Sequence, residues 1–129
     1  MNAQRLLAVA LGGALGTLAR LGAEQASLPW PFGHEIAILV VNLLGAFALG
    51  MASGHGLPRL SLNVREGITT GLLGSYTTMS AVAVIASTAS AEVGVSYLVA
   101  TVVLGVLLAW LGVLVGQKAP GAQKDTVPR

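Results

Sequence analysis

The chain has 129 residues, of which 54% are hydrophobic and only 9% are charged. Soluble domains carry about 25% charged residues, so this composition excludes an ordinary soluble domain and predicts an integral membrane protein of one domain. The sequence contains no cysteine, which excludes a disulfide framework, a thiol nucleophile and a thiolate metal site. The net charge is +2, and in a membrane protein a basic excess marks cytoplasmic loops rather than a nucleic-acid partner.

Four apolar segments approach the length of about 20 residues that a helix needs to cross a bilayer. In chain order, we place these predicted spans at residues 6–22, 36–53, 67–87 and 93–116. The first could be mistaken for a signal peptide, but three more spans follow and no clean cleavage site precedes a soluble body. The prediction is therefore one transmembrane domain over residues 1–117 and a polar, disordered tail over residues 118–129.

Small residues recur four positions apart in three of the four spans. They are Gly12 and Gly16 in the first, Gly67, Gly71 and Ser75 in the third, and Gly112 and Gly116 in the fourth. Association of helices in lipid depends on close backbone approach and on interhelical hydrogen bonds. The spacing therefore predicts tight helix pairs. Because four helices make only a thin bundle, we also expect at least a dimer.

Three polar features of the spans each allow two interpretations. Arg20, near the outer end of the first span, either snorkels to the headgroups or supplies a positive charge beside an anion vestibule. Asn42, inside the second span, either hydrogen-bonds to another helix or offers its amide to an anion. Tyr97, Thr101 and Gly105 share one face of the fourth span, where the two hydroxyls could line a pore. Alternatively, Tyr97 is an interfacial anchor and Thr101 bonds to its own backbone.

The third predicted span contains a stretch, residues 71–80, whose composition disfavours an uninterrupted helix. Its ten positions hold two glycines and five hydroxyl side chains. Glycine weakens a helix, and Ser and Thr can hydrogen-bond to nearby backbone instead of extending the helical ladder. Broken helices at membrane depth hold the ion sites of transporters, because the freed backbone groups must face protein, water or an ion. A continuous helix with a closely packed neighbour is the alternative.

Positive charges are distributed unevenly between the two ends of the predicted spans. The N-terminus, the second loop and the tail share one side, and this side carries six of the seven Lys and Arg residues. Arg20 alone belongs to the other side. The positive-inside rule then predicts that both termini are cytoplasmic and that the chain inserts in one direction only.

Acidic residues within the predicted domain all fall at the ends of the spans. They are Glu24, Glu35, Glu66 and Glu92. A proton-coupled exchanger requires a carboxylate embedded in the membrane, so a small multidrug/proton antiporter is a weak alternative. The sequence shows no hydrolytic constellation, phosphate loop or metal-ligand cluster, and we expect no enzyme.

Several stretches together resemble the Fluc/CrcB family of fluoride channels. Residues 16–20 (GTLAR) resemble its first-span Gly-x-x-x-Arg pattern, and residues 41–50 (VNLLGAFALG) resemble its second-span signature. Residues 71–78 (GLLGSYTT) resemble the glycine-threonine run at its third-span break, and Tyr97 and Thr101 match positions of its fourth-span polar track. The resemblance implies an all-α integral membrane fold with four transmembrane helices, the third broken at its centre. It also implies an antiparallel dimer with two pores between the subunits.

The resemblance further implies a function and the residues that carry it. The implied function is a fluoride-specific channel of the inner (plasma) membrane that exports cytoplasmic fluoride passively and lowers its toxicity. Backbone carbonyls at positions matching Gly74 and Thr77 would hold one structural sodium ion that is not transported. The implied pore-lining residues are Arg20, Asn42, Thr78, Ser80, Tyr97 and Thr101. The expected partners are fluoride, membrane lipid and a homologous antiparallel subunit.

Departures from the family pattern favour a heterodimer over a homodimer. The family places phenylalanines just after the threonine pair, where this chain has Met79 and Val82. Ala37 and Ile38 replace the Gly-Thr usually found ahead of Asn42. An antiparallel homodimer also needs a chain that inserts both ways, whereas this chain has a strong charge bias. We therefore expect an oppositely inserted homologous partner. The alternative is a non-conducting subunit that only completes the dimer.

Overall fold

The computed structural model describes residues 3–26 and 29–122, which form helices and short connections without a β-strand. Within these residues, four helical segments are long and apolar enough to cross a membrane. They are α1 (Ala3–Gln25), α2 (Gly33–His55), a composite third span over Leu62–Thr88, and α6 (Ala91–Lys118). The third span consists of α3 (Leu62–Glu66), the π-helical segment η1 (Gly67–Leu73), α4 (Gly74–Tyr76) and α5 (Met79–Thr88). The predicted all-α fold with an interrupted third span is confirmed.

Each helical segment contains the corresponding predicted span and extends beyond it at both ends. A span predicted from hydropathy ends at a charged residue such as Arg5 or Glu66, whereas the backbone hydrogen-bond ladder of the helix continues through that residue. Long charged side chains at the end of a span reach the headgroup region, so the helix need not end there. Of the predicted tail, Lys118 is the last residue of α6, and residues 123–129 lie outside the described residues.

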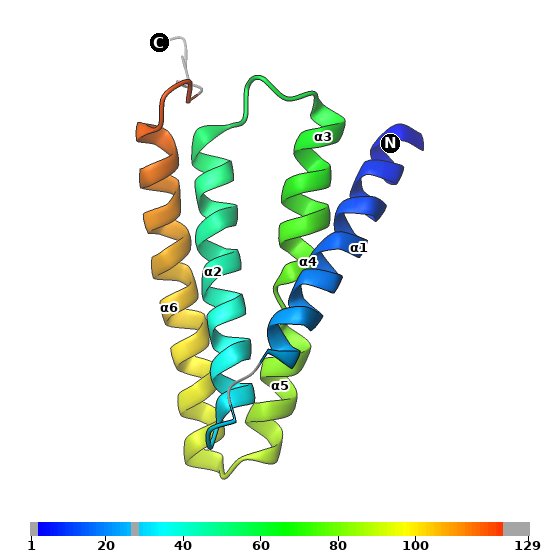
Figure 1. Cartoon of the computed structure of the whole chain (residues 1–129). Helices are drawn as coiled ribbons and strands as arrows, with labels where there is room; N and C mark the ends of the chain where they lie inside the picture. Colours follow the sequence, from blue (N-terminus) through cyan, green and yellow to red (C-terminus); the bar gives the residue numbers. More distant parts are fainter. Residues whose placement is uncertain (1–2, 27–28, 123–129) are drawn as a thin grey trace.

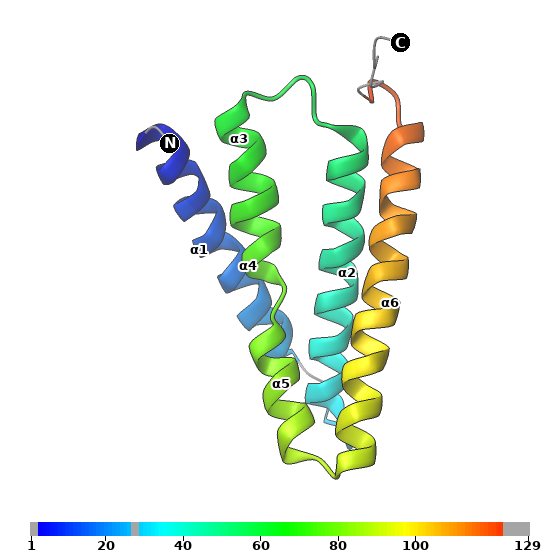
Figure 2. The same cartoon turned by 180° about the vertical axis from the view of Figure 1, so that it is seen from behind.

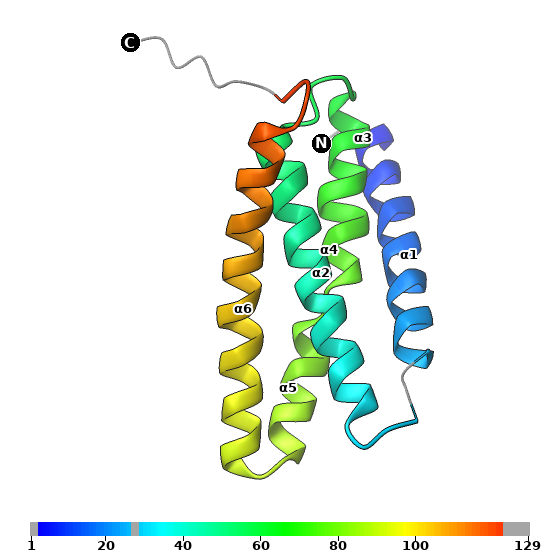
Figure 3. The same ribbon diagram turned by 60° about the vertical axis from the view of Figure 1, so that its left-hand side comes forward.

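The chain runs up and down, so that the start of α1, the connection from α2 to α3 and the end of α6 lie at the same end of the molecule (Figure 1). α2 packs along α6 and α1 packs along η1, while α5 contacts α6 beyond the interruption. Figure 2 shows the same arrangement from behind, with α1 inclined to the other helices. Figure 3 shows α2 between α6 and the third span.

Glycines set the closest contacts between these helices. A Cβ placed on Gly12 would overlap the carbonyl oxygen of Gly67 in η1, and one placed on Gly112 would overlap the carbonyl of Phe47 in α2. The same holds for the second glycine of each predicted pair. Because only a hydrogen occupies these positions, the backbones can approach to carbonyl contact, which is how helices associate in lipid. The predicted close packing is confirmed.

The fully buried apolar side chains of the described chain form a small core beside the interruption of the third span. They are Ile38 and Val41 of α2 and Val82 of α5. The faces of α1 and α6 instead carry exposed large apolar residues along their length. Such exposure carries little penalty in a membrane, where lipid tails are as apolar as leucine. The interruption of the third span therefore lies beside the best-buried apolar residues of the described chain.

Candidate functional site at the interrupted span

The helical ladder of the third span is interrupted at two consecutive threonines. Thr77 (φ −80°, ψ 156°) and Thr78 (φ −147°, ψ 118°) are both extended. The Thr77 N–H still donates to the Leu73 carbonyl at 3.4 Å, which closes the preceding turn. The Thr78 side chain accepts a hydrogen bond from the Ala81 N–H at 3.3 Å and so caps the start of α5. The interruption falls within the predicted stretch, near its C-terminal end.

Asn42 of α2 pairs with both backbone polar groups of Thr78. Its Oδ1 accepts from the Thr78 N–H at 2.7 Å, and its Nδ2 donates to the Thr78 carbonyl at 3.0 Å. Asn42 and Thr78 are buried, with 7% and 9% of their surface exposed. An unpaired buried donor or acceptor costs about 1–3 kcal/mol, so this pairing stabilises the interruption. A primary amide has two N–H donors, and the second remains available to another acceptor.

Thr78 also connects Asn42 to Ser80. The Thr78 Oγ1 and the Ser80 Oγ lie 3.0 Å apart, within hydrogen-bond distance. A hydroxyl has one hydrogen and two lone pairs, so Thr78 can accept from Ala81 and donate to Ser80 at the same time. In that arrangement the hydrogen of the exposed Ser80 hydroxyl is free to point at an anion. Three of the predicted pore-lining residues therefore meet at the interruption.

The predicted sodium ligands Gly74 and Thr77 lie on the N-terminal side of the interruption. α4 ends at Tyr76, so its last carbonyls lack the N–H partners that a continuing helix would supply. The Thr77 hydroxyl donates to the Gly74 carbonyl at 3.4 Å. Gly74 is exposed, and the nearest heavy atom to a Cβ placed on it is 3.7 Å away. Carbonyl oxygens suit a hard cation, so the donor chemistry fits sodium.

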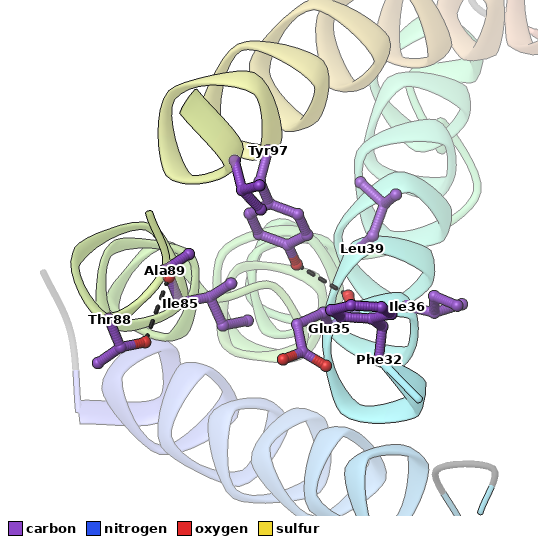
Figure 4. A pocket seen from close by; sticks show the side chains of 9 residues that line it. Phe32, Glu35, Ile36, Leu39, Ile85, Thr88, Ala89 and Tyr97 are labelled. Carbon is purple, nitrogen blue, oxygen red and sulfur yellow. Dashed lines mark hydrogen bonds between the residues drawn. The ribbon is translucent and has the colours of Figure 1, made fainter. Parts of the chain in front are cut away.

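The predicted donors of α6 make no hydrogen bond to Asn42, Thr78 or Ser80 in the described part of the chain and instead bond to backbone carbonyls. The Thr101 hydroxyl donates to the Tyr97 carbonyl of its own helix at 2.8 Å, which is the alternative interpretation of this residue. The Tyr97 hydroxyl donates to the Glu35 carbonyl of α2 at 2.9 Å. Figure 4 shows Tyr97 reaching from α6 across an apolar pocket of about 400 Å³ toward Glu35. Tyr97 thus ties α6 to the start of α2.

Arg20, near the end of α1, is paired with Glu24 one turn further along. Its Nη1 lies 2.8 Å from the Glu24 Oε1, and the two side chains are 22% and 17% exposed. The Arg20 Nε is buried and has no hydrogen-bond partner among the described residues. This pair is not among the predicted features of the first span, although the four-residue spacing of the two charged residues on a helix indicates it. The positive charge of Arg20 is therefore partly compensated.

The model of the family described as CrcB-like protein, Camphor Resistance (CrcB), matches residues 7–113. The chain belongs to the CrcB family. A protein of Bacillus licheniformis named fluoride-specific ion channel FluC 2 is 36% identical over 124 residues, which cover 90% of this chain and 89% of that protein.

Two further relatives, both named fluoride-specific ion channel FluC, have comparable similarity to this CrcB-family chain. The Thermus thermophilus protein is 38% identical over 128 residues, which cover 90% of this chain and 96% of that protein. The Azotobacter vinelandii protein is 36% identical over 115 residues, which cover 84% and 93%. The family assignment made from the sequence motifs is confirmed.

Three of the positions where this CrcB-family chain departs from the family pattern differ in their surroundings. Ile38 and Val82 are fully buried and belong to the small core. Met79 is 57% exposed beside the interruption. The two buried positions contribute packing and no side-chain hydrogen-bond donor.

Proposed function

We propose that this chain is a subunit of a fluoride-specific channel that lets cytoplasmic fluoride leave passively and so lowers its toxicity. The interruption of the third span is the observation that carries the proposal, because it gathers Asn42, Thr78 and Ser80 in a span of an ion-channel family. The relatives at 36–38% identity are named fluoride-specific ion channels. Fluoride is small and strongly hydrated, so a pore must offer donors that replace its water.

The proposed path follows the donors that the sequence analysis identified. Near the interruption, the second N–H of the Asn42 amide and the Ser80 hydroxyl are the groups left free by the pairing with Thr78. Along α6, Tyr97 and Thr101 would have to release their present carbonyl acceptors before donating to an anion. Arg20 would attract fluoride to one mouth of the path. Its pairing with Glu24 would reduce this attraction.

The proposed assembly is an antiparallel pair of this chain with a homologous, oppositely inserted subunit in the inner membrane. Six of the seven Lys and Arg residues belong to the side that holds both termini, which favours one orientation with those termini in the cytoplasm. One chain offers the Gly74 and Thr77 carbonyls, which are fewer oxygens than a hard cation takes. A structural sodium ion at the interruption would therefore need the equivalent groups of the partner.

Fluoride efflux from liposomes tests the proposal. The purified chain is reconstituted alone and together with a homologue of opposite charge bias, and efflux is followed with a fluoride electrode after the membrane potential is short-circuited. We expect fluoride efflux from the paired sample and none from fluoride-loaded liposomes without protein. A lack of fluoride efflux in every pairing would contradict the proposal.

A non-conducting partner subunit is the second candidate, favoured by the burial of Ile38 and Val82. Such a chain would complete the dimer while the other subunit supplies the working pore. Replacing the exposed Ser80 by alanine in the paired channel separates the two functions, because no span packing depends on this hydroxyl. Efflux falls if this chain lines the working pore and is unchanged if it does not. The antiporter alternative is not favoured by the family or by its relatives.

A further inference from the structure

We propose that Asn42 is a positioning residue, which holds the third span open at Thr78 and thereby directs the carbonyl and hydroxyl groups on both sides of the interruption. Its relevance to ion passage rests on the proposed function, whereas its role in keeping the span open stands on hydrogen bonds within the chain. The proposal assigns the interruption to a contact between spans rather than to the glycines that precede it.

The glycines of the third span do not themselves form the interruption. Gly71 lies within η1, and Gly74 has the helical angles φ −64° and ψ −32°. The two extended residues are both threonines, whose branched side chains favour an extended backbone only weakly over a helix. Local preference therefore leaves a continuous helix accessible, and a contact outside the segment has to select the open form.

Asn42 supplies this contact through its two hydrogen bonds to one residue. Because Thr78 is extended, its N–H and carbonyl leave the helical ladder, and both are buried. The amide of Asn42 accepts from the Thr78 N–H at 2.7 Å and donates to the Thr78 carbonyl at 3.0 Å. Two bonds on either side of one Cα fix the position of Thr78 and the orientation of both adjoining peptide groups.

α2 also provides space for the neighbouring residue, one turn after Asn42. A Cβ placed on Gly45 would overlap the methyl group of Thr77 and would approach the Tyr76 ring at 3.2 Å. Gly45 therefore accommodates Thr77 while Asn42 binds Thr78. These two residues of α2, three positions apart, thus contact the two extended residues of the third span. The part of α2 that holds Asn42 and Gly45 therefore accommodates both extended residues of the interruption.

Holding Thr78 in place also positions the polar groups on both sides of the interruption. On the C-terminal side, Thr78 bonds to the Ser80 hydroxyl and caps α5 through the Ala81 N–H. On the N-terminal side, Thr77 donates to the Gly74 carbonyl at 3.4 Å. Fixing Thr78 thus fixes the free Ser80 hydroxyl and the carbonyls that end α4. Loss of Asn42 is expected to disturb all of these groups together.

Amide hydrogen exchange of the full chain in detergent, read by mass spectrometry over residues 76–81, measures this contact. In Asn42→Leu the Thr78 N–H loses its acceptor, and we expect it to exchange about tenfold faster or more, the factor that corresponds to about 1.4 kcal/mol. Tyr97→Phe is the control, because it removes a hydrogen bond between α6 and α2 away from the interruption. Exchange over residues 76–81 should stay unchanged in that control.

Asn42→Asp provides a second readout that a general loss of packing would not give. A protonated carboxyl offers one donor and one acceptor, as the amide does, whereas an ionised carboxylate offers only acceptors. Exchange at Thr78, divided by the wild-type value at the same pH, should approach one at low pH and rise at high pH. The ratio cancels the other titratable groups on α2 and on the helices that contact it, which are Arg5, Arg20, Glu24, His34, Glu35, His55, Tyr76, Glu92, Tyr97 and Lys118.

The outcomes separate this inference from the proposed function. Unchanged Thr78 exchange in Asn42→Leu, or a pH-independent ratio in Asn42→Asp, would overturn the role of Asn42. If Asn42→Leu does not fold, the pH profile of Asn42→Asp decides alone. Fluoride efflux is measured separately: a wild-type pair without efflux contradicts the proposed function, whereas the exchange ratios still decide whether Asn42 holds the span open.

Discussion

A polar side chain inside a membrane span needs a partner, and the proposed pore-lining residues have theirs within the chain. Asn42, Thr78 and Ser80 bond to one another or to adjoining backbone, and Thr101 bonds to its own helix. These groups therefore support the fold as well as any ion path. A substitution at such a position is expected to change stability and flux together, and experiments must separate the two effects.

The contribution of Tyr97 to stability can be measured against a matched control, because the chain has one other tyrosine. Tyr97→Phe removes the hydroxyl that donates to the Glu35 carbonyl at 2.9 Å and keeps the ring in place. We expect a loss of about 1 kcal/mol in unfolding free energy, the typical net contribution of one hydrogen bond. Denaturant unfolding in detergent provides the measurement. Tyr76→Phe is the matched control, since the Tyr76 hydroxyl makes no hydrogen bond in the described part of the chain.

Glu24 modulates the charge of Arg20, and its neutralisation should raise anion attraction. A unit charge about 6 Å away in water contributes about 0.7 kcal/mol, or about threefold in local anion concentration. Glu24→Gln should therefore increase the initial rate of fluoride efflux about threefold at low ionic strength, and salt should reduce this gain. Glu92→Gln is the control, because Glu92 is exposed in the first turn of α6. An equal increase in both variants would contradict a specific role for Arg20.

At the scale of the elements, glycine spacing determines how closely α2 and α6 pack. Within α6, Gly112 faces the Phe47 carbonyl, whereas no other part of the described chain comes within 4 Å of a Cβ placed on Gly105. The two positions lie seven residues apart on one helix. They provide a matched pair in which the same substitution meets opposite surroundings.

Gly112→Ala is expected to destabilise the chain and Gly105→Ala is not. The added methyl of Gly112→Ala forces α6 away from α2, and overpacking of this kind costs about 1–3 kcal/mol. Gly105→Ala gains up to about 1 kcal/mol from the higher helix propensity of alanine. Unfolding of each variant in detergent, monitored by circular dichroism, gives the comparison. Equal stability of the two variants would show that the glycine contact does not control this helix pair.

The four spans could be predicted because membrane-length hydropathy is a local property of the sequence. The interruption was predicted within a ten-residue stretch from glycines and hydroxyls, yet the structure places it at Thr77 and Thr78, where no glycine occurs. Its position depends on Asn42, which lies 36 residues away from Thr78 in the sequence. The π-helical segment η1 likewise packs along α1, whose Gly12 approaches Gly67. Such contacts between spans leave no local signal.

At the scale of the whole molecule, charge placement is expected to fix the orientation of the chain. Arg5, Arg65 and Lys118 belong to elements that meet at one end of the bundle (Figure 1). Arg20 lies near the opposite end of α1. A chain with this bias is expected to insert in one direction, and the proposed antiparallel dimer would then require a second, differently charged subunit. The orientation in cells therefore decides between a homodimer and a heterodimer.

The absence of cysteine makes this orientation directly measurable. Single cysteines are introduced by Leu60→Cys, in the connection before α3, and by Ser90→Cys, just before α6; both positions are exposed and lie at opposite ends of the bundle. A membrane-impermeant maleimide added to intact cells should label Ser90→Cys and leave Leu60→Cys unlabelled, because the positive-inside rule predicts a cytoplasmic position for the side that carries six of the seven basic residues. Permeabilised cells should label both, which controls for thiol reactivity. Comparable labelling of both variants in intact cells would instead mean that the chain inserts both ways, and this result would make a homodimer possible and remove the requirement for a second subunit.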